Sequence, residues 1–274
     1  MTDGRTDRAS PEKLGWESMK RLMVLGLAHL VIAGLAVTST TGLARERTPK
    51  LIASGAHIGV VNLLNAEVMH YHAAREAKDS FLKIQVVHWP VDDMLTEALK
   101  SQLDQLGLTL TALTPTDSLE RTRESCFVNA ALADGLPKHC SATLVEQASS
   151  AGVEYLILMA PGLNNSDHAG NNRDKDVTEA MRGWGFLTSA RAGAKDKPTL
   201  FNETELLLIS ISPEGATLRA RQWGGVYTSQ WQSYTLPADP KAIPRDQLDE
   251  LQPLFAAMLS RQARDLLGQV QVGR

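Results

Sequence analysis

One apolar run near the amino terminus constrains this chain most, because it decides the compartment in which the rest folds. The run covers Leu22–Val37, follows a basic start at Met19, and gives way to small and polar residues. Together with small residues at Gly42 and Ala44, this is the pattern of a secretory signal peptide cleaved after Ala44. The run has 16 residues, whereas a bilayer-spanning helix needs roughly 20. We therefore predict a signal peptide over 19–44, with a retained membrane anchor as the alternative.

The residues around this segment suggest how the chain is divided. Residues 1–18 are polar and of mixed charge, so they cannot bury enough apolar surface to offset the entropy lost on ordering. We expect a disordered leader there, or a start assigned upstream of a true start at Met19. Thr48-Pro49 indicates a linker over 45–56. Residues 57–274 are expected to form a single domain, periplasmic or secreted, and a retained anchor would tether it to the inner membrane through 22–37.

Charge and cysteine content narrow the class of protein. The net charge is −3 and no run is rich in Lys or Arg, so nothing points to a nucleic-acid partner. The chain has two cysteines, Cys126 and Cys140, and in an oxidising compartment this pair predicts a disulfide worth about 3 kcal/mol. Two separate buried thiols are the alternative. No cysteine directly follows the apolar run, which excludes a lipoprotein anchor.

Hydrophobic periodicity changes along the chain from strands to helices and back to strands. Alternating or continuous apolar runs predict strands, and a 3.6-residue period predicts amphipathic helices. The expected strands are 57–64, 67–72, 81–89, 108–113, 153–159 and 181–189, then a hairpin of 200–211 with 216–231; the expected helices begin near 92, 117 and 141, with a last one over 245–267. This order predicts an α+β or three-layer α/β fold, in which helices pack on a mixed sheet.

Two histidines make a candidate metal site. His70 and His72 are two residues apart, so on a strand both would point to one face, a spacing that metal sites use. His57 or His88 on a neighbouring strand could add a ligand. The alternative is a pair of partly exposed strand histidines with no ligand.

A polar loop over 161–178 offers weaker patterns. Ser166-Asp167-His168 has the residue types of a hydrolase triad, but three adjacent residues cannot form the relay. Asn172, Asp174 and Asp176 have the alternate spacing of a calcium loop, yet the required Gly and Glu are missing at the later positions. An irregular calcium site and a solvated loop are the two interpretations left open.

Large aromatic residues gather in the later strands. If several of them share an exposed face, they form an apolar patch suited to a protein partner or to glycan stacking. The alternative is that they are the largest residues of the core. The candidate binding residues are Trp184, Trp223, Tyr227 and Trp231.

The order of elements behind a signal sequence resembles a set of bacterial envelope proteins. Strand, helix Asp92–Leu106, strand Leu108–Leu113, a helical segment, Val153–Met159 and a late hairpin are similar to the amino-terminal domain of the Tol-system propeller protein, the curli-secretion lipoprotein and the small lipoproteins that activate peptidoglycan synthases. The resemblance covers about 57–235, is architectural and has no diagnostic motif. It implies an assembly or binding role in the envelope, and it assigns no role to any single residue.

We therefore expect a non-enzymatic envelope protein that binds a protein or glycan partner and needs no cofactor. One alternative is a metal-dependent envelope hydrolase that uses His70 and His72. Another is a periplasmic domain that binds a small molecule.

Overall fold

A computed structural model describes residues 50–74, 76–128, 136–162, 183–189, 197–225 and 230–273. These residues belong to one compact unit that begins at Thr48. The expected leader, the signal segment 19–44 and nearly all of the polar loop 161–178 lie outside the described residues. None of the helices in these ranges is long and apolar enough to cross a membrane.

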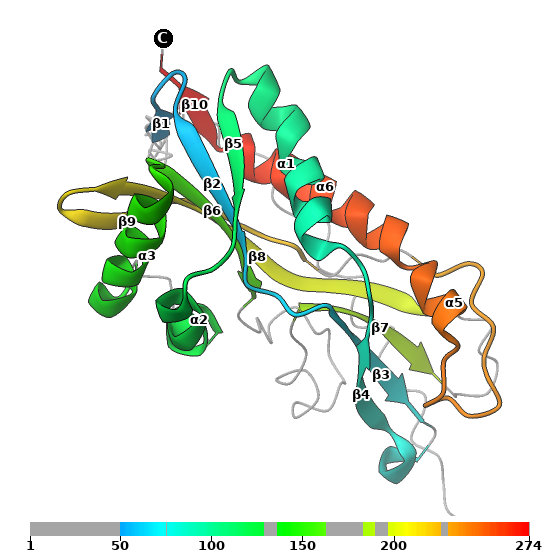
Figure 1. Cartoon of the computed structure of the whole chain (residues 1–274). Helices are drawn as coiled ribbons and strands as arrows, with labels where there is room; N and C mark the ends of the chain where they lie inside the picture. Colours follow the sequence, from blue (N-terminus) through cyan, green and yellow to red (C-terminus); the bar gives the residue numbers. More distant parts are fainter. Residues whose placement is uncertain are drawn as a thin grey trace, which may run out of the picture. The chain divides into compact units, whose positions relative to one another are not determined.

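Along the chain, strands come first, helices and strands alternate in the middle, and a second run of described strands precedes the last helices and a short final strand (Figure 1). Their bounds are β1 Lys50–Ile52, β2 His57–Asn62, β3 Glu67–Ala73, the 3₁₀ turn η1 Ala77–Asp79, β4 Phe81–Val86, α1 Val91–Gln105, β5 Thr109–Leu113, α2 Asp117–Arg123, the π turn η2 Glu124–Val128, α3 Lys138–Ala151, β6 Tyr155–Pro161, β7 Gly183–Ser189, β8 Thr199–Ser212, β9 Gly215–Trp223, α5 Arg245–Asp249, α6 Gln252–Leu267 and β10 Val270–Val272.

Eight of these strands form one mixed sheet. Seven follow the order β4-β3-β7-β8-β6-β2-β5, and β9 pairs with β8 outside this path. Parallel and antiparallel ladders both occur, since β2 runs parallel to β5 and β6 while β8 runs antiparallel to β6, β7 and β9. The α+β fold, the late hairpin and the carboxyl-terminal helix are therefore confirmed.

The long strand β8 joins two halves of this sheet. Its first residues, 199–203, pair with β7, and residues 204–210 pair with β6. The backbone carbonyls of consecutive strand residues point to opposite edges of the strand. On β8, Glu203 O accepts from Gly162 N at 2.7 Å, and the next residue's oxygen, Thr204 O, accepts from Gly224 N at 2.8 Å. Hence β6 and β7 lie end to end on one side of β8, with β9 on the other. We call β5, β2, β6 and β9 the first sheet half, and β4, β3 and β7 the second.

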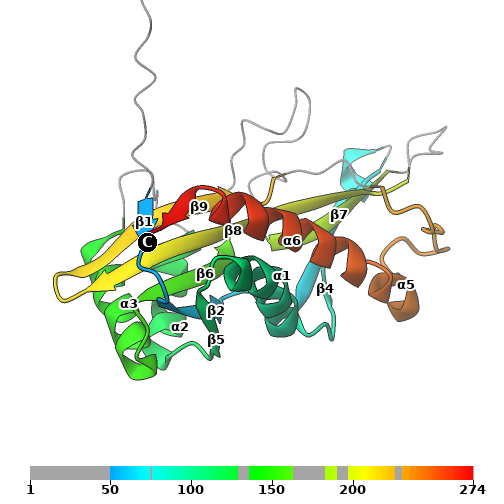
Figure 2. The ribbon, with the colours of Figure 1, turned by 90° about the horizontal axis from the view of Figure 1, so that it is seen from above.

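The two faces of the sheet bury separate hydrophobic clusters. Alternation along β8 sends Leu206 and Leu208 into the cluster with α1 and α6, and Leu207 and Ile209 into the cluster with α2 and α3. The helix α6 packs beside α1 and runs along β8 (Figure 2). Both faces of the first sheet half are therefore covered by helices.

Two parallel crossovers pack on opposite faces of the first sheet half. The first runs from β2 through α1 to β5, the second runs from β5 through α3 to β6, and both β5 and β6 pair with β2. Each helix is followed by a glycine with positive φ, 67° at Gly107 and 64° at Gly152, a conformation that L residues rarely adopt. Acidic Asp92 and Asp93 lie in the first turn of α1, where they complement the helix dipole.

The expected strands 57–64 and 67–72 correspond to β2 and β3, which do not pair with each other, because β3 pairs with β4 and β7. The reason is local: Leu64 N donates to Asn62 Oδ1 at 2.8 Å, a side-chain turn that displaces the chain without reversing it. The expected linker 45–56 contains β1, which pairs in parallel with β10.

Candidate functional site

A small crevice lies where β2 and β6 end. The neighbours of β2 on its two sides are reached by separate crossovers, and such a switch point at the carboxyl ends of parallel strands is where open α/β sheets bind ligands. The cavity measures about 140 Å³ and is lined by Leu63, Leu64, Asn65, Glu67, Met69, Arg123, Glu124, Pro161 and Gly183. We call this cavity the crevice.

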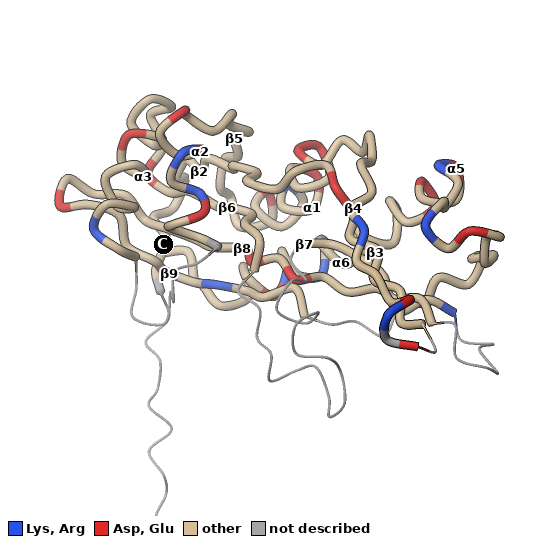
Figure 3. The backbone as a smooth tube through the Cα atoms, turned by 90° about the horizontal axis from the view of Figure 1, so that it is seen from below, with Lys and Arg blue, Asp and Glu red and all other residues tan. Residues whose placement is uncertain are grey.

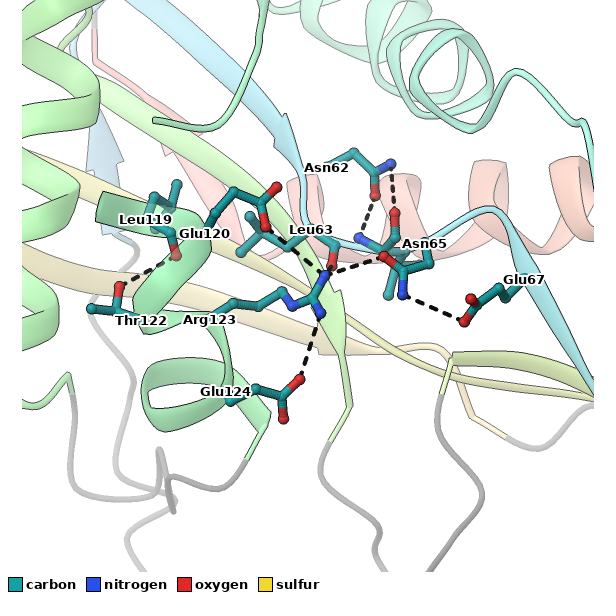
Figure 4. Close-up of polar contacts among 10 residues, drawn as sticks. Asn62, Leu63, Asn65, Glu67, Leu119, Glu120, Thr122, Arg123 and Glu124 are labelled. Carbon is teal, nitrogen blue, oxygen red and sulfur yellow. Dashed lines mark hydrogen bonds and ion pairs between the residues drawn. The ribbon is translucent and has the colours of Figure 1, made fainter. Parts of the chain in front are cut away.

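The guanidinium of Arg123 is held at the crevice by the loop after β2 (Figure 4). Its Nη1 donates to the backbone oxygen of Leu63 and to Oδ1 of Asn65, both at 3.3 Å. Glu124 lies 3.6 Å from Nη2, and Glu120 lies 4.0 Å from Nη1. The Arg123 side chain is 23% exposed, so its charge is fixed in position and compensated by two carboxylates.

Asparagines shape the loop that receives Arg123. Besides accepting from Leu64 N, Asn62 donates through Nδ2 to Oδ1 of Asp92 at 2.8 Å, which ties the end of β2 to the first turn of α1. Asn65 Nδ2 donates to Oε2 of Glu67 at 3.4 Å. Each asparagine therefore uses both its amide and its carbonyl, which keeps the wall of the crevice in one arrangement.

A disulfide fastens the segment next to Arg123. Cys126 in η2 and Cys140 in α3 have sulfur atoms 2.10 Å apart and Cα atoms 5.7 Å apart, and both residues are buried. The predicted bridge is confirmed. Among the residues that the structure describes, these cysteines and His139 form the one cluster of potential metal ligands. Since both thiols are consumed by the bond, this cluster cannot bind zinc through thiolates.

His70 and His72 are buried and share a hydroxyl group. His70 Nε2 and His72 Nδ1 each lie 2.7 Å from Oγ1 of Thr188 on β7. His70 Nδ1 is buried without a hydrogen-bond partner, which favours the tautomer that carries no proton there. His70 then donates to Thr188, and Thr188 donates to His72.

Burial keeps both imidazoles neutral. It lowers the pKa of His70 to about 3, with smaller contributions from the charges of His72 and Lys83, and it lowers the pKa of His72. The two residues are not the exposed strand histidines that the alternative interpretation expects. The structure brings no third ligand to them among the described residues, and neither His57 nor His88 joins the pair.

The tryptophans do not form an exposed aromatic surface. Trp184 and Trp231 are 3% and 1% exposed; Trp184 stacks on Phe255 at 5.5 Å between ring centroids. Trp223 is half-buried and its Nε1 donates to Oε2 of Glu203 at 2.9 Å. Tyr227 lies outside the described residues. As binding residues Trp184 and Trp231 are therefore excluded, because their side chains fill the core.

The crevice was not found from the sequence, because its residues come from separate segments. Arg123 and Glu124 end α2 and begin η2, Asn65 precedes β3, Glu67 begins it, and Pro161 ends β6. None of them forms a motif by spacing. The one sequence cue is the pair of asparagines, Asn62 and Asn65, directly after a buried strand, since Asn is common where a side chain must bond to nearby backbone.

Comparisons with known proteins add little to this site. No family model matches the chain, and no curated protein is similar to it in sequence. Among solved structures, it is similar to the hypothetical protein CT253 from Chlamydia trachomatis, determined at 1.65 Å resolution. That match has 12% sequence identity, covers 77% of this chain and 94% of the other, and has a TM-score of 0.33. A likeness at this level shows neither a shared fold nor a shared function.

Proposed function

We propose that this protein is a non-enzymatic binding or assembly module of the bacterial envelope, and that it engages a protein partner at the crevice. The observation that carries the proposal is the combination of a switch-point cavity with a fixed and compensated Arg123. Such a cavity offers shape and hydrogen-bonding groups to a partner's side chain, and its two carboxylates, Glu67 and Glu124, already contact Asn65 and Arg123.

The residues around the crevice favour binding over catalysis. Its described lining holds no Ser, Cys, His or Lys, the side chains that most often act as nucleophile or general base. Small-molecule sites usually measure about 300–1,000 Å³, and the crevice is near 140 Å³. That volume suits one inserted side chain of a partner better than a free metabolite.

Two features support an extracytoplasmic location. Structural disulfides persist in oxidising compartments and are rare in a reducing cytosol. The amino-terminal segment 19–44 has the pattern of a signal peptide. The resemblance to the Tol-system, curli-secretion and synthase-activating proteins implies the same location, the bacterial envelope, and an assembly role there. Positive and negative side chains are interspersed along the described backbone, without a long stretch of one sign, which supports a protein partner over nucleic acid (Figure 3).

Site-specific photo-cross-linking tests the proposed partner. A photoreactive amino acid in place of Asn65 or Glu124, both exposed at the crevice, should give one discrete adduct with an envelope protein in growing cells. The control position is Lys100, which is exposed on α1 and away from the crevice lining. Adducts at neither crevice position, or equal adducts at Lys100, would show that the crevice is not a binding site.

Cell fractionation tests the compartment separately. The protein should be released by osmotic shock, or stay with the inner membrane if the anchor is retained, and Cys126 and Cys140 should resist alkylation until a reductant is added. Recovery in the cytosol with alkylatable thiols would contradict the envelope location.

A further inference from the structure

The edge strand β4 exposes an apolar stripe. Leu82, Ile84 and Val86 are 37%, 51% and 69% exposed, and as alternate residues of one strand they share a face. Three of the five exposed large apolar residues in the described ranges lie on this one six-residue strand. Apolar side chains gathered in this way mark an interaction surface more often than isolated ones do.

The orientation of β4 is the reverse of what its sequence pattern predicts. Apolar Leu82, Ile84 and Val86 alternate with Lys83 and Gln85, and an amphipathic edge strand normally turns its apolar side to the core. Here Gln85 is 9% exposed and faces inward, while the apolar stripe faces outward. None of the described residues buries the stripe, so the pattern is satisfied if a partner covers it.

The register with β3 shows which face of the sheet the polar residues of β4 occupy. Lys83 pairs with His70 and Gln85 pairs with Val68, so both polar residues lie on the face of the buried histidines. Lys83 Nζ also donates to the backbone oxygen of Lys241 at 2.6 Å. Charged side chains on an edge strand, inward-pointing ones included, oppose pairing between molecules. Here the Lys83 ammonium is bonded to Lys241 O within the chain, on the face opposite the stripe.

The outer edge of β4 is available for pairing among the described strands. β4 is the last strand of the sheet, with β3 as its neighbour and no other described strand beside it. A free edge presents unpaired backbone N–H and C=O groups to another extended chain.

We propose that β4 pairs antiparallel with β4 of a second copy of this chain, with Ile84 opposite Ile84. Directly opposed residues in an antiparallel ladder share a face, so a two-fold ladder must centre on one self-paired residue. Centring on Ile84 sets Leu82 against Val86 and Lys83 against Gln85. All three apolar side chains then meet their counterparts, and no like charges are opposed.

The other possible centres fit less well. A ladder centred on Lys83 opposes two lysines, which is unfavourable. A ladder centred on Leu82 sets Ile84 against Ser80, and one centred on Gln85 sets Leu82 against His88. A strand of six residues gives a small interface, so the dimer is reversible and depends on protein concentration. The pairing uses no residue that lines the crevice, although Ile84 and Val86 lie directly across from Met69 and Glu67, which do line it. The dimer is tested separately from the proposed function.

Analytical ultracentrifugation of the mature chain tests the dimer. The weight-average mass should rise toward twice the monomer mass as concentration increases, and the Ile84→Lys variant should stay monomeric because it opposes two lysines at the two-fold axis. The matched control is Leu236→Lys, which changes an exposed leucine outside β4 and should dimerise like the wild type. A wild-type protein that is monomeric at every concentration overturns the proposal, as does a dimer that Ile84→Lys leaves intact.

Oxidative cross-linking tests the register. No free cysteine occurs among the described residues. Ile84→Cys would place a thiol on each of two opposed residues whose Cα atoms lie about 5 Å apart, within the Cα separation that a disulfide spans. Ile84→Cys should form a covalent dimer under mild oxidation, and Lys100→Cys on α1 should not. Equal cross-linking at both positions refutes the register. Capture of a different envelope protein by Ile84→Cys, with no homodimer, shows that β4 pairs with a partner strand instead.

Discussion

Mild acid should destabilise this protein through the imidazole of His70. That side chain is 0% exposed, lies face to face with Phe186 at 4.5 Å between ring centroids, and bonds through Nε2 to Thr188. Its pKa falls from 6.5 to about 3, mainly because burial penalises the charged ring and also because His72 and Lys83 are near. In the unfolded chain the same ring regains its ordinary pKa.

The sign and size of the effect follow from this difference in pKa. Between about pH 6.5 and pH 3 the unfolded state binds a proton that the folded state does not, so the free energy of unfolding falls as pH falls. Above the unfolded pKa the full stability is present. From about pH 7.5 to about pH 5, His70 alone should remove about 2 kcal/mol, at 1.36 kcal/mol for each unit of pKa. The result changes little for any folded pKa below about 4. His72, whose pKa burial also lowers, adds a further loss of the same sign.

Urea unfolding at the two pH values measures this loss directly. The wild type should lose about 2 kcal/mol more than His70→Leu, because the leucine cannot take up the proton in either state. His88→Gln is the matched control, because it changes an exposed histidine outside the buried pair. The reasoning is refuted if His70→Leu, shown to be folded at neutral pH, loses as much stability in acid as the wild type does.

Three further perturbations test other parts of the structure. Replacing Cys126 and Cys140 together by Ala should lower the free energy of unfolding by about 3 kcal/mol for the 14-residue separation, and dithiothreitol should change the wild type but not the variant. Arg221→Met removes the partner 2.8 Å from the buried Glu205 carboxylate and should cost about 3–5 kcal/mol near neutral pH. Burial raises the pKa of Glu205 against the opposing effect of Arg221, so the cost should shrink as pH falls, and adding Glu205→Gln should recover most of the stability in urea titrations. Metal analysis of the purified protein should find no stoichiometric zinc, whereas zinc that is lost in the His70→Ala, His72→Ala variant would support the hydrolase alternative.

The periodicity of apolar residues, together with turn and helix-ending residues, predicted the helices and strands whose bounds depend on nearby sequence. The apolar run around Leu206–Ile211 and the turn at Ser212-Pro213-Glu214-Gly215 define the β8–β9 hairpin before any tertiary contact is known. Gly107 follows the carboxyl end of α1 and has a positive φ, a conformation in which glycine commonly ends a helix. The last helix also begins anew near Pro253, where α6 follows α5.

Long-range pairing decides the features that periodicity could not predict. The polar stretch Asn202–Glu205 reads as an exposed part of a strand, yet all four side chains are buried. Their partners come from elsewhere, since Gln262 on α6 accepts from Asn202 Nδ2 and from Thr204 Oγ1, each at 3.2 Å. The end-to-end placement of β6 and β7 along β8 creates the crevice in the same way, from segments that are far apart in the sequence.

The aromatic residues and β4 together explain where an interaction surface can lie. The sequence left two interpretations of the tryptophans, an exposed patch or a place in the core, and in the structure Trp184 and Trp231 fill the core at the second sheet half. The face of β4 that holds Lys83 and Gln85 turns toward that core, so its aliphatic residues, including Ile84, face outward. An amphipathic strand whose apolar face stays exposed conflicts with the rule that burial sets strand orientation, and such conflicts in natural proteins are expected at functional surfaces. Most of the exposed large apolar side chains in the described residues therefore belong to a sheet edge, where the backbone itself can add affinity and fix the register of a partner strand.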